Sequence, residues 1–332
     1  MHAPRLIAVD PTAPDPSLLA PAAELLRKGG LVAFPTETVY GLGADARNPE
    51  AVRRIFEAKG RPATNPLIVH VANVQAARSI TAAWPDIAEQ LAAAFWPGPL
   101  TLLLPKRPEI PDLVTAGLPA VGVRIPAHPV ALALLKEAGI PVAAPSANPY
   151  MGISPTEARH VIAGLGDRVD AVVDGGACAV GIESTVLDLT GEVPTVLRPG
   201  GVSLEAIRRL APNARMAHLV AGEGPQASPG LARRHYAPKA PLELIGREEI
   251  GPALAATGDL PVAVLTIGPA PASLVRAVIH ALPSDPEGYA AALYATLHAL
   301  DATGVARILV ERPPETDQWA AVRDRLSRAA AR

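Results

Sequence analysis

Four cations of the first 200 residues have neighbours that suggest more than a solvated surface. Lys59 and Arg61 lie beside a glycine and a proline, Arg124 stands inside an apolar run, and Arg198 follows another. Guanidinium and ammonium groups bind phosphate and carboxylate oxygens, and an arginine can do so through two parallel hydrogen bonds. A buried arginine needs an anionic partner, for which a ligand carboxylate is one candidate. These residues suggest a site for anionic ligands.

Hydroxyl and amide side chains occur in comparable places. Ser146 and Asn148 follow the apolar run 142–144, Ser184 precedes another run, and Thr38 lies in a polar segment after a third. Loops at strand ends of an open sheet commonly bind ligands. Together with the cations, these groups describe an anion-binding cavity that suits a nucleotide and a small carboxylate, and is too small for duplex nucleic acid.

Each residue also has a purely structural explanation. Lys59 and Arg61 could be favourable charges at a helix C-terminus, and taken alone that explanation is preferred. His70, within an apolar run, could be a core histidine with its hydrogen bonds satisfied. Ser146 and Asn148 could simply form a turn. The functional interpretation therefore depends on the whole set.

Standard motifs do not explain the set. The sequence has no GxxxxGK, and the segment 41–46 fits GxGxxA but is separated from its strand and lacks an acidic residue about 20 positions on. The eight histidines show no HExxH spacing. Cys178 is the only cysteine, which excludes an intrachain disulfide and a cysteine-rich zinc site and is expected to be an inert thiol.

Composition limits the class of protein. The chain has 332 residues, 49% of them hydrophobic, and a net charge of −2, which favours about two folded domains over disorder. The balanced charge excludes a generally basic nucleic-acid coat. No uninterrupted apolar run approaches the roughly 18 residues of a membrane span, and the first residues do not resemble a signal peptide. We expect a cytoplasmic protein that does not enter a membrane.

Two secondary-structure patterns alternate along the first two thirds of the chain. Strands are predicted at 6–9, 31–34, 67–71, 100–104, 121–125, 142–144, 169–173 and 185–189. Helices are predicted at 18–27, 50–59, 87–95, 129–138, 155–163 and 204–210. This order favours an α/β fold with one mixed sheet covered by helices.

A linker is predicted at 211–240, where glycine and proline are frequent and no period is visible. The predicted domains are thus 1–210, which carries the candidate site, and a smaller C-terminal α/β unit, 241–332. Its strands are expected at 242–245, 262–266, 275–279 and 308–310, and its helices at 249–256, 287–300 and 319–328. Trp319 is expected in the core, and a solvated helix face is expected to carry Arg323, Arg325, Arg328 and Arg332.

Seven blocks in order resemble the YrdC-like family over about residues 5–210. They are 34–43, Lys59/Arg61/Pro62 with 65–70, 96–101, 123–126, 144–148, 183–185 and 197–200. The C-terminal unit, with His235-Tyr236-Ala237-Pro238 at its entrance, resembles the longer two-domain form of that family. The resemblance implies a twisted open mixed sheet, classed as α/β or in some schemes α+β, and a smaller Rossmann-like domain.

The resemblance also implies a reaction. Members of the family make threonylcarbamoyl-AMP and pyrophosphate from L-threonine, bicarbonate and ATP, a nucleotidyltransferase step that leads to the threonylcarbamoyladenosine of certain tRNAs. Mg²⁺ would arrive with ATP, without protein side chains as metal ligands and without an organic cofactor. The product would pass to a tRNA threonylcarbamoyltransferase, and a weak contact with tRNA is conceivable. The alternative is a tRNA-binding or double-stranded RNA-binding module without turnover of its own.

Site residues follow from the same resemblance. It assigns catalysis to Lys59 and Arg61. It places L-threonine at Thr38, His70, Arg124, Ala144 (through its backbone) and Ser184. It places ATP at Arg61, Asn65, Ala120 (through its backbone), Ser146, Asn148, Ser154, Arg198 and Tyr236. The linker that carries Tyr236 is expected to close over the site as a lid, because a carbamate or acyl-phosphate is lost to water.

Overall fold

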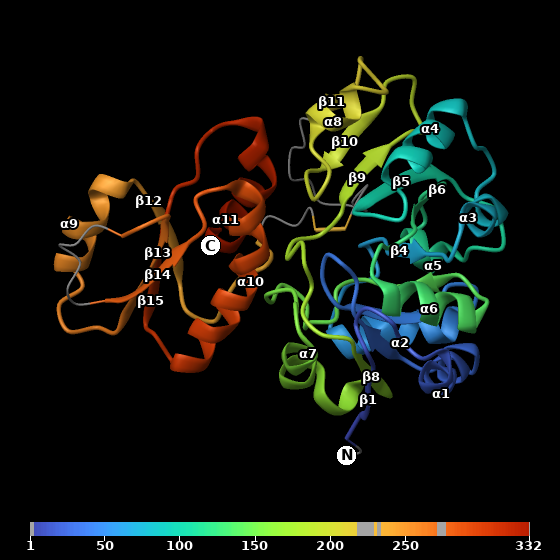
Figure 1. The fold of residues 1–332 in the computed structure, drawn as a ribbon, viewed down its shortest axis with the longest axis horizontal. Coiled ribbons are helices and arrows are strands. Elements are labelled where there is room, and N and C mark those ends of the chain that lie inside the picture. Colours follow the sequence, from blue (N-terminus) through green and yellow to red (C-terminus); the bar gives the residue numbers. More distant parts are fainter. Residues whose placement is uncertain (1–2, 218–228, 231–233, 271–276, 332) are drawn as a thin grey trace.

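A mixed eleven-stranded sheet forms the larger part of the computed structural model, which describes residues 3–217, 229–230, 234–270 and 277–331 (Figure 1). Its strand order is β1-β8-β2-β3-β7-β4-β6-β5-β9-β10-β11. The strands are β1 (Arg5–Ala8), β2 (Val32–Phe34), β3 (Gly41–Asp45), β4 (Ile68–His70), β5 (Leu100–Pro105), β6 (Ala120–Arg124), β7 (Val142–Ala143), β8 (Ala171–Asp174), β9 (Thr185–Asp188), β10 (Thr195–Arg198) and β11 (Arg215–Met216). The sheet contains both parallel pairs, such as β4/β6, and antiparallel pairs, such as β2/β3, so the predicted mixed sheet is confirmed.

Helices flank this sheet. They are α1 (Pro16–Arg27), α2 (Pro49–Lys59), α3 (Val74–Ile80), α4 (Asp86–Phe95), α5 (Asp112–Thr115), α6 (Pro129–Ala138), α7 (Ala158–Leu165) and α8 (Leu204–Arg208). The α2 helix begins at Pro49, where the Asn48 side chain accepts hydrogen bonds from two free backbone N–H groups, and it ends at Gly60 in the left-handed conformation. These two signals fix the ends of the helix, so that Lys59 is its last residue and Arg61 follows it.

The second unit has a sheet of four parallel strands in the order β12-β15-β13-β14. Its elements are β12 (Leu242–Ile245), α9 (Ile250–Ala255), β13 (Val262–Ile267), β14 (Val278–Leu282), α10 (Pro286–Thr303), β15 (Arg307–Glu311) and α11 (Ala320–Ala330). In Figure 1, α10 and α11 lie between this sheet and the larger unit. The smaller α/β unit expected from the sequence is therefore present.

Several predictions of secondary structure were wrong or incomplete. The strands β10 and β11 were not predicted, and β11 lies within the predicted linker 211–240. Residues 41–45 form a strand, β3, where a polar loop was expected, while α3 and α5 were missed altogether. Gly43 explains the strand, because a Cβ there would lie 2.8 Å from the Phe34 ring and 2.9 Å from Val142. The two glycines that imitate a phosphate motif thus allow strands to pack closely. The β14 strand starts at Val278, whereas the predicted strand began within 271–276, which lie outside the described residues.

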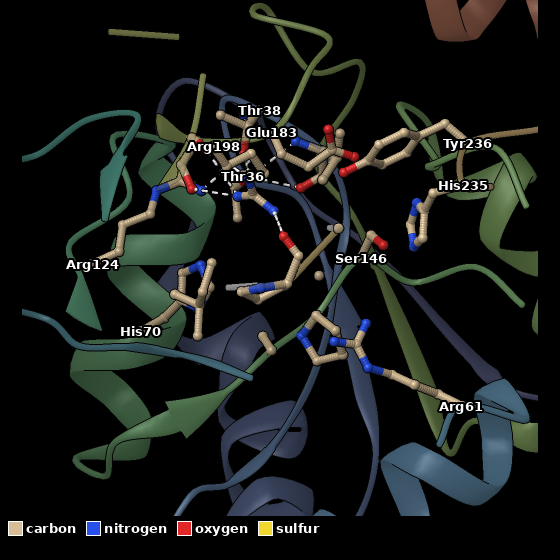
Figure 2. A pocket seen from close by; sticks show the side chains of 18 residues that line it. Thr36, Thr38, Arg61, His70, Arg124, Ser146, Glu183, Arg198, His235 and Tyr236 are labelled. Atoms are coloured by element: carbon tan, nitrogen blue, oxygen red, sulfur yellow. Dashed lines mark hydrogen bonds between the residues drawn. The ribbon is translucent and has the colours of Figure 1, made fainter. Parts of the chain in front are cut away.

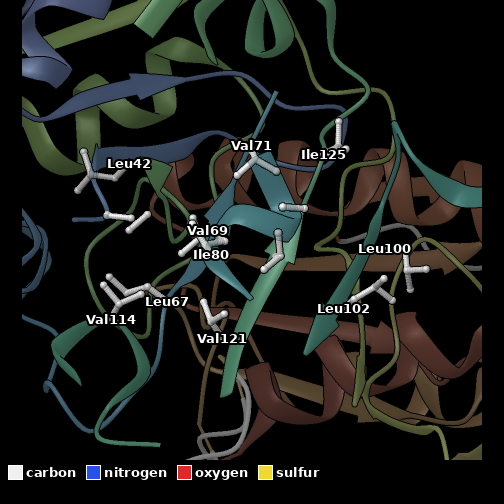
Figure 3. Packing of buried hydrophobic residues seen from close by; sticks show 14 of the residues in the cluster. Leu42, Leu67, Val69, Val71, Ile80, Leu100, Leu102, Val114, Val121 and Ile125 are labelled. Carbon is white, nitrogen blue, oxygen red and sulfur yellow. The ribbon is translucent and has the colours of Figure 1, made fainter. Parts of the chain in front are cut away.

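The core of the larger unit is built from small aliphatic side chains (Figure 3). Leu42, Val69, Leu102 and Val121 contribute to it from four different strands, and each is at most 1% exposed. A separate cluster forms the core of the second unit and includes Trp319, as predicted. Among the described residues, no helix has the length and apolar character needed to cross a membrane.

Gly200 allows the turn after β10 to pass directly behind the backbone of Glu183, Ser184 and Thr185, since a Cβ at this glycine would overlap atoms of all three. We predict that Gly200→Ala lowers the free energy of unfolding by about 1–3 kcal/mol, as over-packing usually does. Urea unfolding measures the change. Gly191→Ala is the matched control, because a Cβ there meets nothing within 4 Å. Equal stability of the two variants would contradict this account.

Candidate functional site

A polar cavity lies at the strand ends of the larger sheet (Figure 2). About 530 Å³ of space, which includes open solvent, lies among its lining residues. Nine of the residues predicted from the sequence line it: Thr38, Arg61, His70, Arg124, Ala144, Ser146, Ser184, Arg198 and Tyr236. The fold thus brings together side chains that are as far apart in the sequence as Thr38 and Tyr236.

Sheet register places two of these side chains side by side. His70 and Arg124 are partners at the carboxyl ends of the parallel strands β4 and β6. Burial and the nearby Arg124 charge lower the pKa of His70 to about 3, so its imidazole is neutral at physiological pH. This end of the cavity therefore carries one fixed cation beside a neutral ring.

Arg124 already has a partner inside the protein. Its Nη2 lies 2.6 Å from Glu37 Oε1, its Nη1 donates to Thr38 Oγ1 at 3.0 Å, and its Nε donates to the Gly98 carbonyl at 3.1 Å. The sequence predicts a ligand carboxylate as one candidate partner, whereas the structure supplies the carboxylate of Glu37. Neither Arg124 Nη2 nor Glu37 Oε1 has a hydrogen bond of good geometry within the described structure. A ligand carboxylate could therefore still engage this guanidinium.

Arg198 and Ser184 form a second polar group. Arg198 donates from Nε and Nη2 to the Ser184 carbonyl and from Nη2 to Ser184 Oγ, at 2.9–3.1 Å. Ser184 Oγ also lies 2.8 Å from Thr101 Oγ1. Burial lowers the pKa of Arg198 and that of Arg61, in the latter case to about 10, so both remain cations at neutral pH.

Glu183 lines the cavity but was given no role in the sequence analysis, and the same holds for Thr36 and His235. Glu183 Oε1 accepts from Ser154 Oγ at 2.5 Å, and its Oε2 accepts from Arg325 Nε at 2.6 Å and from Tyr294 at 3.2 Å. Burial acts to raise the pKa of Glu183, but Arg325, Arg198 and the hydrogen bonds outweigh it and lower the pKa to about 2. The signal that could have found it is an acidic residue directly before Ser184, within the family-like block 183–185.

Arg325 contradicts the predicted solvated helix face. Its side chain is 0% exposed, because it reaches from α11 to Glu183 in the other unit. Arg328 on the same helix is 18% exposed and pairs with Asp324, whereas Arg332 lies outside the described residues. The helical period of this arginine stripe was clear from the sequence, but its carboxylate partner lies 142 residues away.

Five further predicted residues do not line the polar cavity. Lys59 donates from Nζ to the carbonyls of Ser146 and Asn148, and Asn148 donates to the carbonyls of Pro149 and Gly152. These contacts hold the loop that follows β7. Burial and the Arg61 charge lower the pKa of Lys59 well below its usual value.

The remaining three are Asn65, Ser154 and Ala120. Asn65 donates to the Tyr150 hydroxyl at 3.2 Å, and Ser154 donates to Glu183. Ala120 lies in a second, largely apolar cavity of about 800 Å³ that includes space open to solvent. The two cavities share Ile68 and Pro229, so they adjoin each other.

Residues of the predicted linker form one wall of the polar cavity. Pro229, Gly230, His235 and Tyr236 line it, and Figure 2 shows His235 and Tyr236 on the side opposite Arg124. Burial lowers the pKa of His235 to about 3. Parts of the expected lid, 218–228 and 231–233, lie outside the described residues.

Unpartnered polar atoms gather at this cavity. Nine buried side-chain nitrogen or oxygen atoms of the described residues have no hydrogen-bond partner. Five of them belong to lining residues: Arg61 Nε, His70 Nδ1, His235 Nδ1, the Tyr236 hydroxyl and Arg124 Nη2, the last of which has only its ion pair with Glu37. Because buried polar groups are normally paired, this concentration indicates a site built for a polar ligand.

Within the described ranges, no three His, Cys, Asp or Glu side chains come close enough to hold a metal ion. Cys178 is buried, and burial raises the pKa of its thiol well above the usual value, as expected for an inert cysteine.

Comparison with known proteins links both units to one family. A family model described as "Telomere recombination" matches residues 24–200, and a model described as the C-terminal domain of threonylcarbamoyl-AMP synthase matches residues 202–331. The threonylcarbamoyl-AMP synthase of Bacillus subtilis is 43% identical over 326 residues, which cover 95% of this chain and 93% of that protein. The enzyme of Pyrococcus abyssi is also 43% identical, over 93% of each chain.

Solved structures agree with this result. The crystal structure of Pyrococcus abyssi Sua5 complexed with L-threonine has a TM-score of 0.91 and 40% identity, covering 98% of this chain and 97% of that one. Escherichia coli YciO has a TM-score of 0.56 at 25% identity and covers 61% of this chain. The first likeness extends over both units of the fold.

We predict that His70 and His235 remain neutral in the folded protein from pH 8 down to pH 5. Their pKa values of about 3 lie below the usual 6.5, so neither ring takes up a proton in this range. Unfolding lets both rings protonate, so they cost the fold stability as the pH falls below about 6.5. Nitrogen-15 NMR of labelled histidines measures the charge state, with the urea-unfolded chain as the control. Titration of either ring near pH 6.5 in the folded protein would refute the assignment.

Proposed function

The chain belongs to the threonylcarbamoyl-AMP synthase family, and on that premise we propose that it makes threonylcarbamoyl-AMP and pyrophosphate from L-threonine, bicarbonate and ATP. The observation that supports this most directly is the cavity at the sheet edge, where unpartnered buried donors adjoin an apolar recess. A polyanion with an aromatic base would place the base in the apolar recess and its charges in the polar cavity, with an amino acid bound beside it.

L-Threonine is proposed to bind at the Arg124 end of the polar cavity. The guanidinium would take the carboxylate, with its Nη2 as the donor that lacks an aligned partner. Thr38 and Ser184 would hydrogen-bond the amino acid, and neutral His70 would add a polar contact without adding charge. The backbone at Ala144 would complete this pocket.

ATP is proposed to extend from the apolar recess into the polar cavity. The adenine would lie against the backbone at Ala120, and the phosphates would lie between Arg61, Arg198 and the Tyr236 hydroxyl. Ser146 lines the same space, and Asn65 lies near it through Tyr150. Lys59, Asn148 and Ser154 would act through the loop and the carboxylate that they hold.

The chemistry proposed for this arrangement has two steps. The threonine amine first takes up bicarbonate with loss of water, or CO₂ with loss of a proton, to give a carbamate. A carbamate oxygen then forms a bond to the α-phosphorus while the bond to the pyrophosphate oxygen breaks. This displacement needs alignment and charge neutralisation more than a covalent nucleophile, and buried guanidinium groups supply both. Mg²⁺ bound to the phosphates would add positive charge when it accompanies ATP.

The domain division is proposed as 1–210 for catalysis, 211–240 as a lid and 241–332 as the C-terminal domain. Four residues of the middle segment line the cavity, which supports a closing role for it. A mixed anhydride is readily hydrolysed, so the product would pass directly to a tRNA threonylcarbamoyltransferase in the cytoplasm. A weak contact with tRNA at this stage would aid the transfer.

We predict threonine-dependent pyrophosphate release from ATP in the presence of bicarbonate and Mg²⁺. Arg124→Met should reduce kcat/KM for L-threonine by at least a hundredfold, because the carboxylate loses a charged, desolvated hydrogen bond of about 3 kcal/mol. A coupled pyrophosphate assay measures the rates, with circular dichroism to verify that the variant is folded.

Arg47→Met is the control for this assay, since Arg47 is exposed and lies outside the cavity. Its rate should equal that of the unaltered protein. A rate of pyrophosphate release that does not depend on threonine would contradict the proposed function. Steeply salt-dependent tRNA binding without turnover would then favour the RNA-binding alternative.

A further inference from the structure

One side-chain cluster joins the C-terminal unit to the wall of the polar cavity. Arg325 of α11 and Tyr294 of α10 both contact Glu183 of the larger unit. Glu183 lines the cavity, and it precedes Ser184 in the chain. The C-terminal unit therefore reaches the ligand space through buried side chains.

Arg325 has two roles in this cluster. Its Nε donates to Glu183 at 2.6 Å and its Nη1 donates to Asp324 at 2.6 Å, so two carboxylates fix the plane of the guanidinium. The same guanidinium lies over the ring of Tyr236, with Cζ 5.1 Å from the ring centroid. A cation over a tyrosine face is attracted to it, more so where water is excluded.

Tyr236 is packed against this cluster. Its ring is stacked on Tyr294, with 5.8 Å between centroids, and its backbone has a φ of +60°, which is unusual for a residue with a side chain. Its hydroxyl is buried, lines the cavity and has no hydrogen-bond partner among the described residues. The hydroxyl thus lines the ligand space, while Arg325 and Tyr294 contact the ring.

We propose that Arg325 is a positioning residue for the nucleotide site, which fixes Tyr236 and Glu183 in the cavity wall. The C-terminal unit thereby completes the site. Apart from Tyr236 of the linker, the residues proposed to touch the substrates all belong to the larger unit. This inference rests on the proposed function insofar as the ligand is ATP. A buried ion pair by itself is weak evidence for a gain in stability, so its position against the cavity wall is what favours the positioning role.

The test compares Arg325→Met, Arg325→Lys and Glu183→Gln/Arg325→Met with the unaltered full-length chain. Arg323→Met is the matched control, because Arg323 lies on the same helix and, among the described residues, donates to the carbonyls of residues 314 and 316. Four quantities are measured for each: Tm, the Kd of ATP by calorimetry, and KM and kcat from pyrophosphate release. The Kd requires no turnover, so it tests the inference even if the proposed reaction does not occur.

We expect Arg325→Met to raise the Kd and KM of ATP by at least tenfold, and Arg325→Lys to restore part of the affinity because it keeps the charge. The double variant removes both charges, so its Tm should recover while the Kd stays raised. Arg323→Met should leave the Kd unchanged. A fall in Tm and kcat at an unchanged Kd would overturn the proposal, and so would a double variant with the affinity of the unaltered chain. Absence of threonine-dependent turnover in the unaltered chain would instead contradict the proposed function alone.

Discussion

The burial of several cations around one cavity is the constraint on which the rest of the structure depends. Lys59, Arg61, Arg124 and Arg198 are each at most 7% exposed. Desolvated cations repel one another and cost free energy unless oxygen atoms surround them. Backbone carbonyls meet most of this need, and the loops that carry those carbonyls are held in place in return.

Two carboxylates supply further oxygen atoms around the cations, and both belong to segments that the sheet places beside them. Glu37 lies in the loop between β2 and β3 and pairs with Arg124, whereas Glu183 lies before β9 and faces Arg198 and Arg325. The cations still outnumber these carboxylates, so the charge of the cavity favours an anionic ligand. Its charge is fixed by packing and does not depend on flexible surface chains.

Aromatic side chains are scarce, and their distribution marks the boundary between the two units. Only 3% of the residues are aromatic, yet three of the five tyrosines belong to one buried cluster. That cluster also contains Val39, Ile153 and Ile182 of the larger unit. The core of the C-terminal unit therefore extends across the boundary into the larger unit, and Tyr236 and Tyr294 are packed in it. The C-terminal unit is joined to the larger one by core packing, which goes beyond a tether.

Local patterns predicted the elements well where one physical signal dominated. The α6 helix was predicted at its observed bounds, since His128, Pro129 and Gly139 mark its ends. The strand β3 was missed because its glycines serve close packing between strands, which no local period reveals. Seven blocks in order predicted most of the cavity lining. Glu183 and Arg325 escaped because a partnership across 142 residues leaves no trace in local spacing.

The pairing of Arg124 with Glu37 has a consequence for release. The carboxylate of threonine is unchanged in threonylcarbamoyl-AMP, so a group that binds it binds both the substrate and the product. Binding both states equally well does not speed the chemical step, and it slows the departure of the product. If Arg124 binds the threonine carboxylate as proposed, a guanidinium already paired with Glu37 at 2.6 Å would hold it less tightly than an unpaired one would. The internal carboxylate would then compete with the product and favour its release before the next turnover.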